Sequence, residues 1–136
     1  MFIVDTSDTY YLDNIYLDID RLCERYGSIL NKKIIGRSVE GRDIVALRLF
    51  SEKDEILRCA QNDTNPILQN VEKPAVLFIG GIHAREDFSV MLCMNMIEHY
   101  CYYYSQDKMF DDFDVKSIIN NVDMYFVPVA NPDGLN

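Results

Sequence analysis

The chain has 136 residues, the length of one ordinary domain, and 49% of them are hydrophobic. Its 22 acidic and 13 basic residues give a formal net charge of −9, and no basic run could follow a phosphate backbone, which argues against nucleic acid as a partner. No apolar run reaches membrane-spanning length. The N-terminus, MFIVDTSD, has no basic region, so we expect no signal peptide; the cytoplasm is then the default and the compartment stays open.

The N-terminal third predicts a helix followed by a hairpin. Apolar residues recur at steps of three and four over residues 12 to 26, which is typical of a helix with one apolar face. Ser7 and Asp8 are candidate N-caps, and Gly27 stands where the helix should end. In KKIIGRSVEGRDIVALRLF, two β-rich runs flank Gly41, which can supply the positive φ of a tight turn.

The remaining segments alternate strands and helices. Residues 51 to 73 are polar and predict a connection, with a short helix from Lys53 to Cys59. PAVLFIGG is apolar on both faces and predicts a central strand covered on each side. FSVMLCMNMIEHYCYYY predicts a long helix, and residues 124 to 130 predict a second buried strand. Two buried strands separated by a helix indicate an α/β sheet with crossovers.

The four cysteines argue against two familiar kinds of site. They form no CxxC pair, so neither a thioredoxin-type motif nor a zinc ribbon is expected. Cys23 and Cys93 lie within apolar helical patterns, where a reduced thiol packs as a small hydrophobe. This use of cysteine suits a reducing compartment.

Two titratable residues follow the first buried strand. His83 and Glu86 come directly after Gly80 and Gly81, which let the backbone turn sharply. Ligands of open α/β sheets bind outside the carboxyl ends of the strands. An imidazole and a carboxylate three residues apart in a loop can converge on one Zn²⁺ ion. A bare H-x-x-E pattern also arises by chance, so its position at a strand end is what favours a metal site.

Three segments together resemble one family. GGIHARE resembles the metal-binding signature of the zinc metallocarboxypeptidases, the carboxypeptidase A/B-like or funnelin family. IGRSVEGRDI resembles the family's N-terminal hairpin, and VPVANPDGLN resembles the strand and turn of its Asn-Pro-Asp-Gly signature. ANPDGLN and Asp87 look closer to bacterial members, some of which cleave cell-wall peptides at γ-D-glutamyl bonds. The implied fold is a mixed, largely parallel sheet with helices on both faces, of which residues 1–136 would be the N-terminal half, a single incomplete domain.

The resemblance implies roles for individual residues. His83 and Glu86 match two of the family's three zinc ligands. Arg85 matches an arginine that holds substrate in parts of the family; the alternative is a solvated side chain paired with Asp87. Within Asn131, Asp133 and Gly134 we expect turn chemistry, with Asp133 as a candidate buttress of the site. His99 is expected to be a helix histidine away from the site.

The family's remaining catalytic groups follow the Asn-Pro-Asp-Gly turn. The third zinc ligand, the glutamate that acts as general base, an Asn-Arg pair and a substrate-capping tyrosine are therefore expected beyond Asn136. The resemblance implies zinc-dependent hydrolysis of peptides or cell-wall peptides, with this chain inactive without the C-terminal half. The isolated chain should associate through apolar surface left open at Leu77, Phe78, Tyr125 and Val127. The alternative is a non-catalytic remnant that acts as a binding module; a nucleotide binder is disfavoured because GxGxxG and GxxxxGK[ST] are absent.

Overall fold

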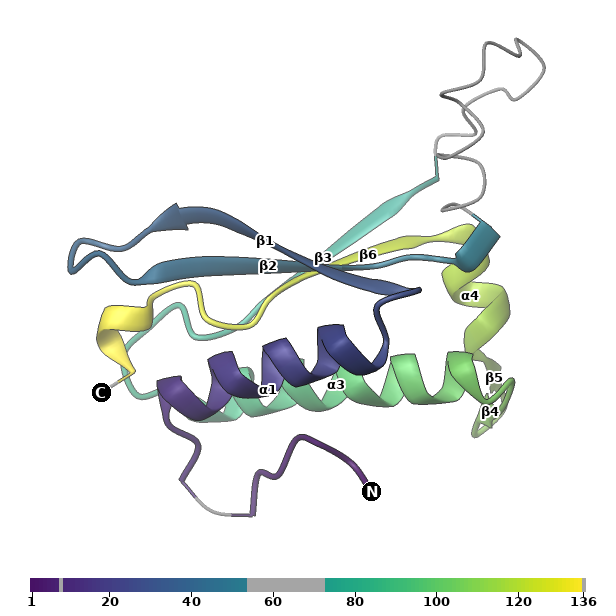
Figure 1. Cartoon of the computed structure of the whole chain (residues 1–136), viewed down its shortest axis with the longest axis horizontal. Coiled ribbons are helices and arrows are strands. Elements are labelled where there is room, and N and C mark those ends of the chain that lie inside the picture. Colours follow the sequence, from purple (N-terminus) through teal and green to yellow (C-terminus); the bar gives the residue numbers. More distant parts are fainter. Residues whose placement is uncertain (8, 54–72, 136) are drawn as a thin grey trace, which may run out of the picture.

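The computed structural model describes residues 1–7, 9–53 and 73–135 (Figure 1). The first elements are α1 (Leu12–Arg25), β1 (Leu30–Arg37) and β2 (Asp43–Leu49). After the gap come β3 (Ala75–Ile79) and α3 (Asp87–Ser105), followed by two very short strands, β4 (Met109–Phe110) and β5 (Phe113–Asp114). The chain then forms α4 (Val115–Asn121), β6 (Asp123–Val127) and the 3-10 turn η1 (Pro132–Gly134). The helix predicted from Lys53 to Cys59 lies almost entirely outside the described residues.

The main sheet is mixed, with the strand order β1-β2-β6-β3. β1 and β2 pair antiparallel, and so do β2 and β6, whereas β3 and β6 pair parallel from Ala75↔Asp123 to Ile79↔Val127. A short turn forces the hairpin to be antiparallel, and the crossover through α3 allows the parallel pair. The mixed α/β class is thus confirmed, but only one of the three described pairs in this sheet is parallel.

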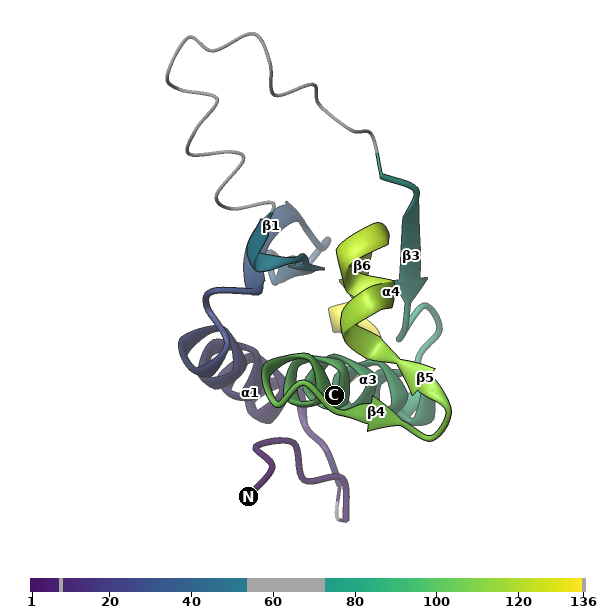
Figure 2. The ribbon, with the colours of Figure 1, turned by 90° about the vertical axis from the view of Figure 1, so that its right-hand side faces the viewer.

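The two long helices, α1 and α3, form one layer against the sheet. Figures 1 and 2 show α1 and α3 side by side on the same face. The expectation of helices on both faces is therefore not met within the described residues. β3 lies at the edge of the sheet formed by the described strands, and Val76, Leu77 and Ile79 are 42%, 56% and 48% exposed. Within the described part of the chain this strand is not covered on each side, and the exposed Leu77 is part of the open apolar surface that the sequence predicts for this chain.

The core lies between the helices and the sheet. Ile15, Ile19 and Leu22 lie on the buried face of α1, which confirms the one-faced helix. On the sheet side the core includes Leu47 and Phe126, and Phe126 stacks on Phe78 with ring centroids 4.9 Å apart. Of the residues expected to be uncovered, Leu77 is exposed, Phe78 and Tyr125 are half-buried, and Val127 is buried.

Local sequence signals predicted the hairpin turn more accurately than the start of the first helix. Gly41 adopts φ +81° in the turn between β1 and β2, as predicted. The residue preceding α1 is Tyr11, and it caps the helix with no side-chain hydrogen bond. The Ser7 cap is therefore wrong: both the amide and the hydroxyl of Ser7 donate to the carboxylate of Asp5. Asp8 lies outside the described residues.

The described cysteines are free thiols inside the helix layer. Cys93 and Cys101 are buried and Cys23 is half-buried, as expected for small hydrophobes. Burial raises the pKa of all three thiols, which favours their protonated form. In the part of the chain that the structure describes, no helix combines the length and apolar character needed to cross a membrane.

Candidate metal centre

The loop after β3 is fastened to the segment after β6. Gly80 donates its amide to the carbonyl of Val127 at 2.9 Å, and the amide of Ala130 donates back to the carbonyl of Gly80 at 3.0 Å. One residue further on, the amide of Asn131 donates to the carbonyl of Gly81 at 2.9 Å. The parallel pairing thus continues past both strand ends and places the His83–Glu86 loop beside the Asn-Pro-Asp-Gly turn.

Both glycines of the Gly-Gly pair are required by this packing. A Cβ on Gly80 would lie 2.7 Å from the carbonyl oxygen of Pro128 and 2.8 Å from that of Ser89. Gly81 adopts φ +56°, and a Cβ there would lie 3.0 Å from a methyl group of Val90. The loop therefore fits between the end of β6 and the first turn of α3 only because these positions lack side chains.

The imidazole of His83 and the carboxylate of Glu86 meet at the surface. His83 Nδ1 lies 2.9 Å from Glu86 Oε1, and the two side chains are 77% and 49% exposed. This contact lowers the pKa of Glu86, chiefly through the hydrogen bond from His83. The carboxylate is consequently held in the deprotonated form that a metal ligand must have.

Ser89, which the sequence analysis did not single out, stabilises this loop through hydrogen bonds. The hydroxyl of Ser89 accepts a hydrogen bond from the amide of Gly81 and donates to the carbonyl of Glu86, both at 2.9 Å. The amide of Glu86 also donates to the carbonyl of His83 at 3.4 Å, which closes the loop on itself. The available signal was a serine three residues after Glu86, in the first turn of the predicted helix, where hydroxyls commonly cap backbone groups.

The two side chains fit half of a zinc site. Tetrahedral zinc with bonds of about 2.0–2.2 Å holds two ligand atoms roughly 3.4 Å apart. The observed nitrogen–oxygen distance of 2.9 Å needs only a few tenths of an ångström of separation to match. Among the described residues, however, no group of three or more His, Cys, Asp or Glu could hold a metal ion. His99 belongs to no such group; it lies on α3, where its Nδ1 is 2.8 Å from the carbonyl of Asn95 and its ring stacks on Phe2.

Arg85 lies between the two candidate ligands with an exposed side chain. It adopts φ +68°, a left-handed conformation that is uncommon for a residue with a side chain. Its side chain is solvated, as the alternative expects, but among the described residues no ion pair joins it to Asp87. The substrate-binding role of Arg85 stays a prediction.

The Asn-Pro-Asp-Gly turn joins the other two motifs. Pro132–Gly134 form η1, which confirms the expected turn. The carboxylate of Asp133 reaches the hairpin, where it accepts hydrogen bonds from Ser38 Oγ at 2.7 Å and Arg42 Nη1 at 2.8 Å. On its other side the turn packs against the metal loop, because a Cβ on Gly134 would lie 3.0 Å from Ala84 Cα. All three motifs therefore meet at one end of the sheet.

Comparison with known families decides the assignment. The family model described as zinc carboxypeptidase, Peptidase_M14, matches residues 15–136. The chain belongs to the zinc carboxypeptidase family. Membership of this family implies Zn²⁺ as the cofactor.

Three relatives with sequence similarity are each much longer than this chain. It is 32% identical over 124 residues to an inactive metallocarboxypeptidase of Saccharomyces cerevisiae, covering 90% of this chain and 24% of the relative. It is 30% identical over 133 residues to carboxypeptidase B2 of Bos taurus, covering 94% and 26%. To a zinc carboxypeptidase of Saccharothrix mutabilis it is 25% identical over 118 residues, covering 87% and 23%. The chain thus spans about a quarter of the length of these relatives, and the leaning toward bacterial members stays a prediction.

Solved structures agree on the fold. The crystal structure of thrombin activatable fibrinolysis inhibitor superposes with a TM-score of 0.73 at 27% identity, covering 97% of this chain and 28% of that one. Carboxypeptidase A from Helicoverpa armigera gives a TM-score of 0.61 at 26% identity, covering 94% and 26%. The described sheet and helices are therefore those of a carboxypeptidase domain.

Proposed function

We propose that this chain forms the N-terminal part of a zinc-dependent carboxypeptidase domain, in which His83 and Glu86 supply two of three zinc ligands. The observation that carries the proposal is the 2.9 Å approach of His83 Nδ1 to Glu86 Oε1, exposed at the carboxyl end of β3. A catalytic zinc site takes three protein ligands and keeps a further position open for water or substrate. The third ligand and the general base are then expected in polypeptide that follows residue 136.

Each group of the loop has a distinct task in this proposal. A zinc ion held here would supply Lewis-acid chemistry for the hydrolysis of a peptide bond. His83 and Glu86 hold the ion in place, and the hydrogen bonds of Ser89 keep the loop that carries them closed. The exposed guanidinium of Arg85, beside the ligands, can form paired hydrogen bonds with a substrate carboxylate.

The open side of the sheet supports the view that the domain continues. β3 pairs with β6 alone among the described strands, which leaves one of its edges without a strand partner there. An edge strand that carries three exposed aliphatic residues is ordinarily paired or covered in a folded protein. We therefore propose that the C-terminal half of the domain pairs with β3 and covers Val76, Leu77 and Ile79.

Zinc analysis of the full-length polypeptide that contains this chain tests the proposal. We expect about one zinc per parent molecule. His83→Ala and Glu86→Ala should each lose it. His99→Ala is the matched control, since it removes the other histidine from a site on α3, and it should keep its zinc. Zinc retention by both loop variants at the parental level would refute the ligand assignment.

Hydrolysis assays on the same proteins address the substrate. A peptide with a free C-terminal carboxylate and a peptide ending in a γ-D-glutamyl linkage separate the two substrate classes. We expect the zinc-loaded parent to cleave one of them and the loop variants to cleave neither. Zinc binding without cleavage of either peptide would instead favour the non-catalytic binding module.

A further inference from the structure

One carboxylate outside the metal loop is held by an unusual number of donors. Asp133 Oδ1 accepts hydrogen bonds from Ser38 Oγ at 2.7 Å and Arg42 Nη1 at 2.8 Å, and Asp133 Oδ2 accepts one from the amide of Glu40 at 3.1 Å. All three donors come from the turn between β1 and β2, 91 to 95 positions earlier in the chain. Asp133 therefore anchors the η1 turn to the hairpin.

The hairpin turn is shaped to receive this carboxylate. The amide of Ser38 donates to the carbonyl of Arg42 at 2.9 Å, and the amide of Gly41 donates to the carbonyl of Ser38 at 3.0 Å. Ser38 Oγ also accepts the amide of Arg42 at 3.0 Å, which aims its own proton at Asp133. Because the donors converge from two directions and one is a guanidinium, the site favours an anion with two accepting oxygens over a neutral amide.

The η1 turn packs against the His83–Glu86 loop. Gly134 packs so closely on Ala84 that an added Cβ would lie 3.0 Å from Ala84 Cα and 3.1 Å from Ala84 Cβ. The amide of Asn131 also holds the carbonyl of Gly81 at 2.9 Å. The loop between the two candidate ligands thus packs against a turn that is held by these backbone bonds and, on its other side, by Asp133.

This support matters because the loop backbone is strained. Arg85 adopts φ +68° between His83 and Glu86. A residue with a side chain persists in that region only where the surrounding structure holds it there. If the η1 turn were not held in place, the loop could relax. His83 Nδ1 and Glu86 Oε1 would then no longer point toward the same metal ion.

We infer that Asp133 is a positioning residue for the zinc loop: it ties η1 to the hairpin and so holds His83 and Glu86 in the geometry that binds the ion. The inference deepens the proposed function and rests on it. Groups that orient metal ligands typically change metal affinity by about 10- to 100-fold when they are removed. Asp133 acts through Ala84 and the backbone, so we expect the lower end of that range.

The test compares two carboxylates in the full-length, metal-loaded protein. Asp133→Asn removes the anchor, while Asp123→Asn removes a similarly shielded carboxylate that pairs with Arg48 at 2.8 Å at the other end of β6. The side chains of Asp133 and Asp123 are 18% and 15% exposed, so both changes disturb comparable surroundings. Zinc affinity is measured by competition with a chelator, and the visible absorption spectrum of the cobalt-substituted protein reports the ligand geometry.

We expect Asp133→Asn to weaken zinc binding about tenfold and to shift the cobalt spectrum. Asp123→Asn should match the parent in both measurements. Ser38→Ala, which leaves the other two bonds to Asp133 in place, should give a smaller loss in the same direction and decides the matter if Asp133→Asn fails to fold.

The outcomes separate this inference from the proposed function. Parental zinc affinity and cobalt spectrum in Asp133→Asn would overturn the positioning role while leaving the zinc site intact. An equal loss in Asp123→Asn would overturn it too, because the effect would then be general destabilisation. A parent protein that binds no zinc would refute the proposed function, and the inference would fall with it.

Discussion

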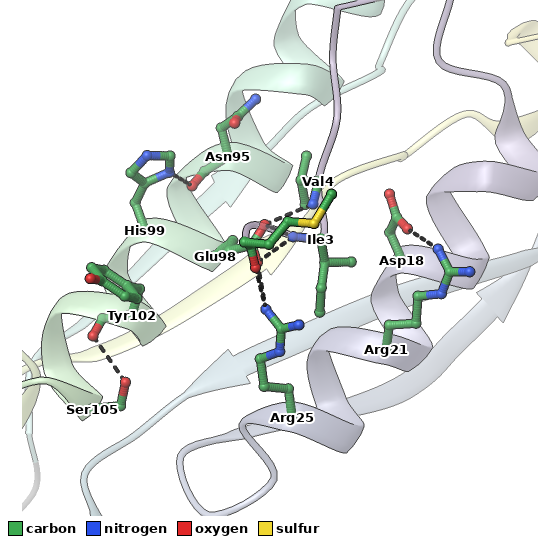
Figure 3. Close-up of polar contacts among 11 residues, drawn as sticks. Ile3, Val4, Asp18, Arg21, Arg25, Asn95, Glu98, His99, Tyr102 and Ser105 are labelled. Carbon is green, nitrogen blue, oxygen red and sulfur yellow. Dashed lines mark hydrogen bonds and ion pairs between the residues drawn. The ribbon is translucent and has the colours of Figure 1, made fainter.

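The carboxylate of Glu98 accepts the backbone amide of Ile3 with both of its oxygens, at 2.7 and 2.9 Å (Figure 3). The amide of Val4 adds a third hydrogen bond at 2.7 Å, and Arg25 lies 3.5 Å away on α1. Glu98 is only 1% exposed. A buried α3 carboxylate thus ties the N-terminal segment to the helix layer, at a distance from the metal loop.

Glu98→Ala should destabilise the protein without affecting zinc binding. The change leaves the buried amide of Val4 and the half-buried amide of Ile3 without their acceptor and removes the ion-pair partner of Arg25, which costs about 3 kcal/mol of unfolding free energy. Urea denaturation of the full-length protein measures the loss. Glu40→Gln, at an exposed position, is the control and should stay within about 0.5 kcal/mol of the parent. A Glu98→Ala variant as stable as the parent would show that the segment is not anchored in this way.

Acid should remove the stabilisation that Asp133 provides. The hydrogen bond from Ser38, followed by the Arg42 guanidinium, lowers the pKa of Asp133 in the folded state. As the pH falls, Asp133 is therefore protonated at a higher pH in the unfolded chain than in the folded protein. The contribution of the ionised carboxylate is complete above the ordinary value of about 3.9 and is lost as the pH falls through the lower folded value.

The measurement is the difference in unfolding free energy between the parent and Asp133→Asn across pH 3 to 7, in the metal-free proteins. We expect a constant difference from about pH 5 upward and a shrinking one below about pH 4. Other titrating groups are common to both proteins and cancel in the difference. A difference that stays unchanged down to pH 3 would contradict the lowered pKa.

Signals confined to a few neighbouring residues predicted the local structure well. The helix rhythm over residues 12 to 26 and the Gly41 turn both follow from side-chain spacing and from the conformational freedom of glycine. The strand after Lys73 was also recognised, but its place at the edge was not. The apolar pattern of a strand indicates that its side chains are buried in the complete fold. It does not indicate where the strand lies in the order of the sheet.

The candidate site was predicted only in part. His83 and Glu86 were found because the sequence places them three residues apart beside a strand end, and the structure brings their side chains together. The bonds of Ser38 and Arg42 to Asp133 join residues more than 90 positions apart, and no local pattern reports such a contact. The sequence marks Asp133 as a candidate buttress within a turn, but it does not show that the carboxylate is held by the hairpin.

The open edge of β3 gives the last prediction. Residues 1–136 expressed alone should form concentration-dependent oligomers, because Val76, Leu77 and Ile79 expose apolar surface beside an edge with no strand partner among the described strands. Size-exclusion chromatography with light scattering measures this directly. The full-length protein, whose C-terminal half is proposed to cover the edge, should remain monomeric under the same conditions.

A charged substitution on β3 distinguishes association through the β3 edge from non-specific association. Leu77→Lys places an ammonium on the exposed side of β3 and should shift the short chain toward the monomer, since edge lysines oppose strand-to-strand pairing. Val39→Lys is the matched control, because Val39 is fully exposed in the hairpin turn, far along the chain from β3. If both variants shift the short chain toward the monomer equally, net charge rather than the β3 edge governs association. If the short chain is a monomer with a cooperative melt, residues 1–136 fold without further cover for β3.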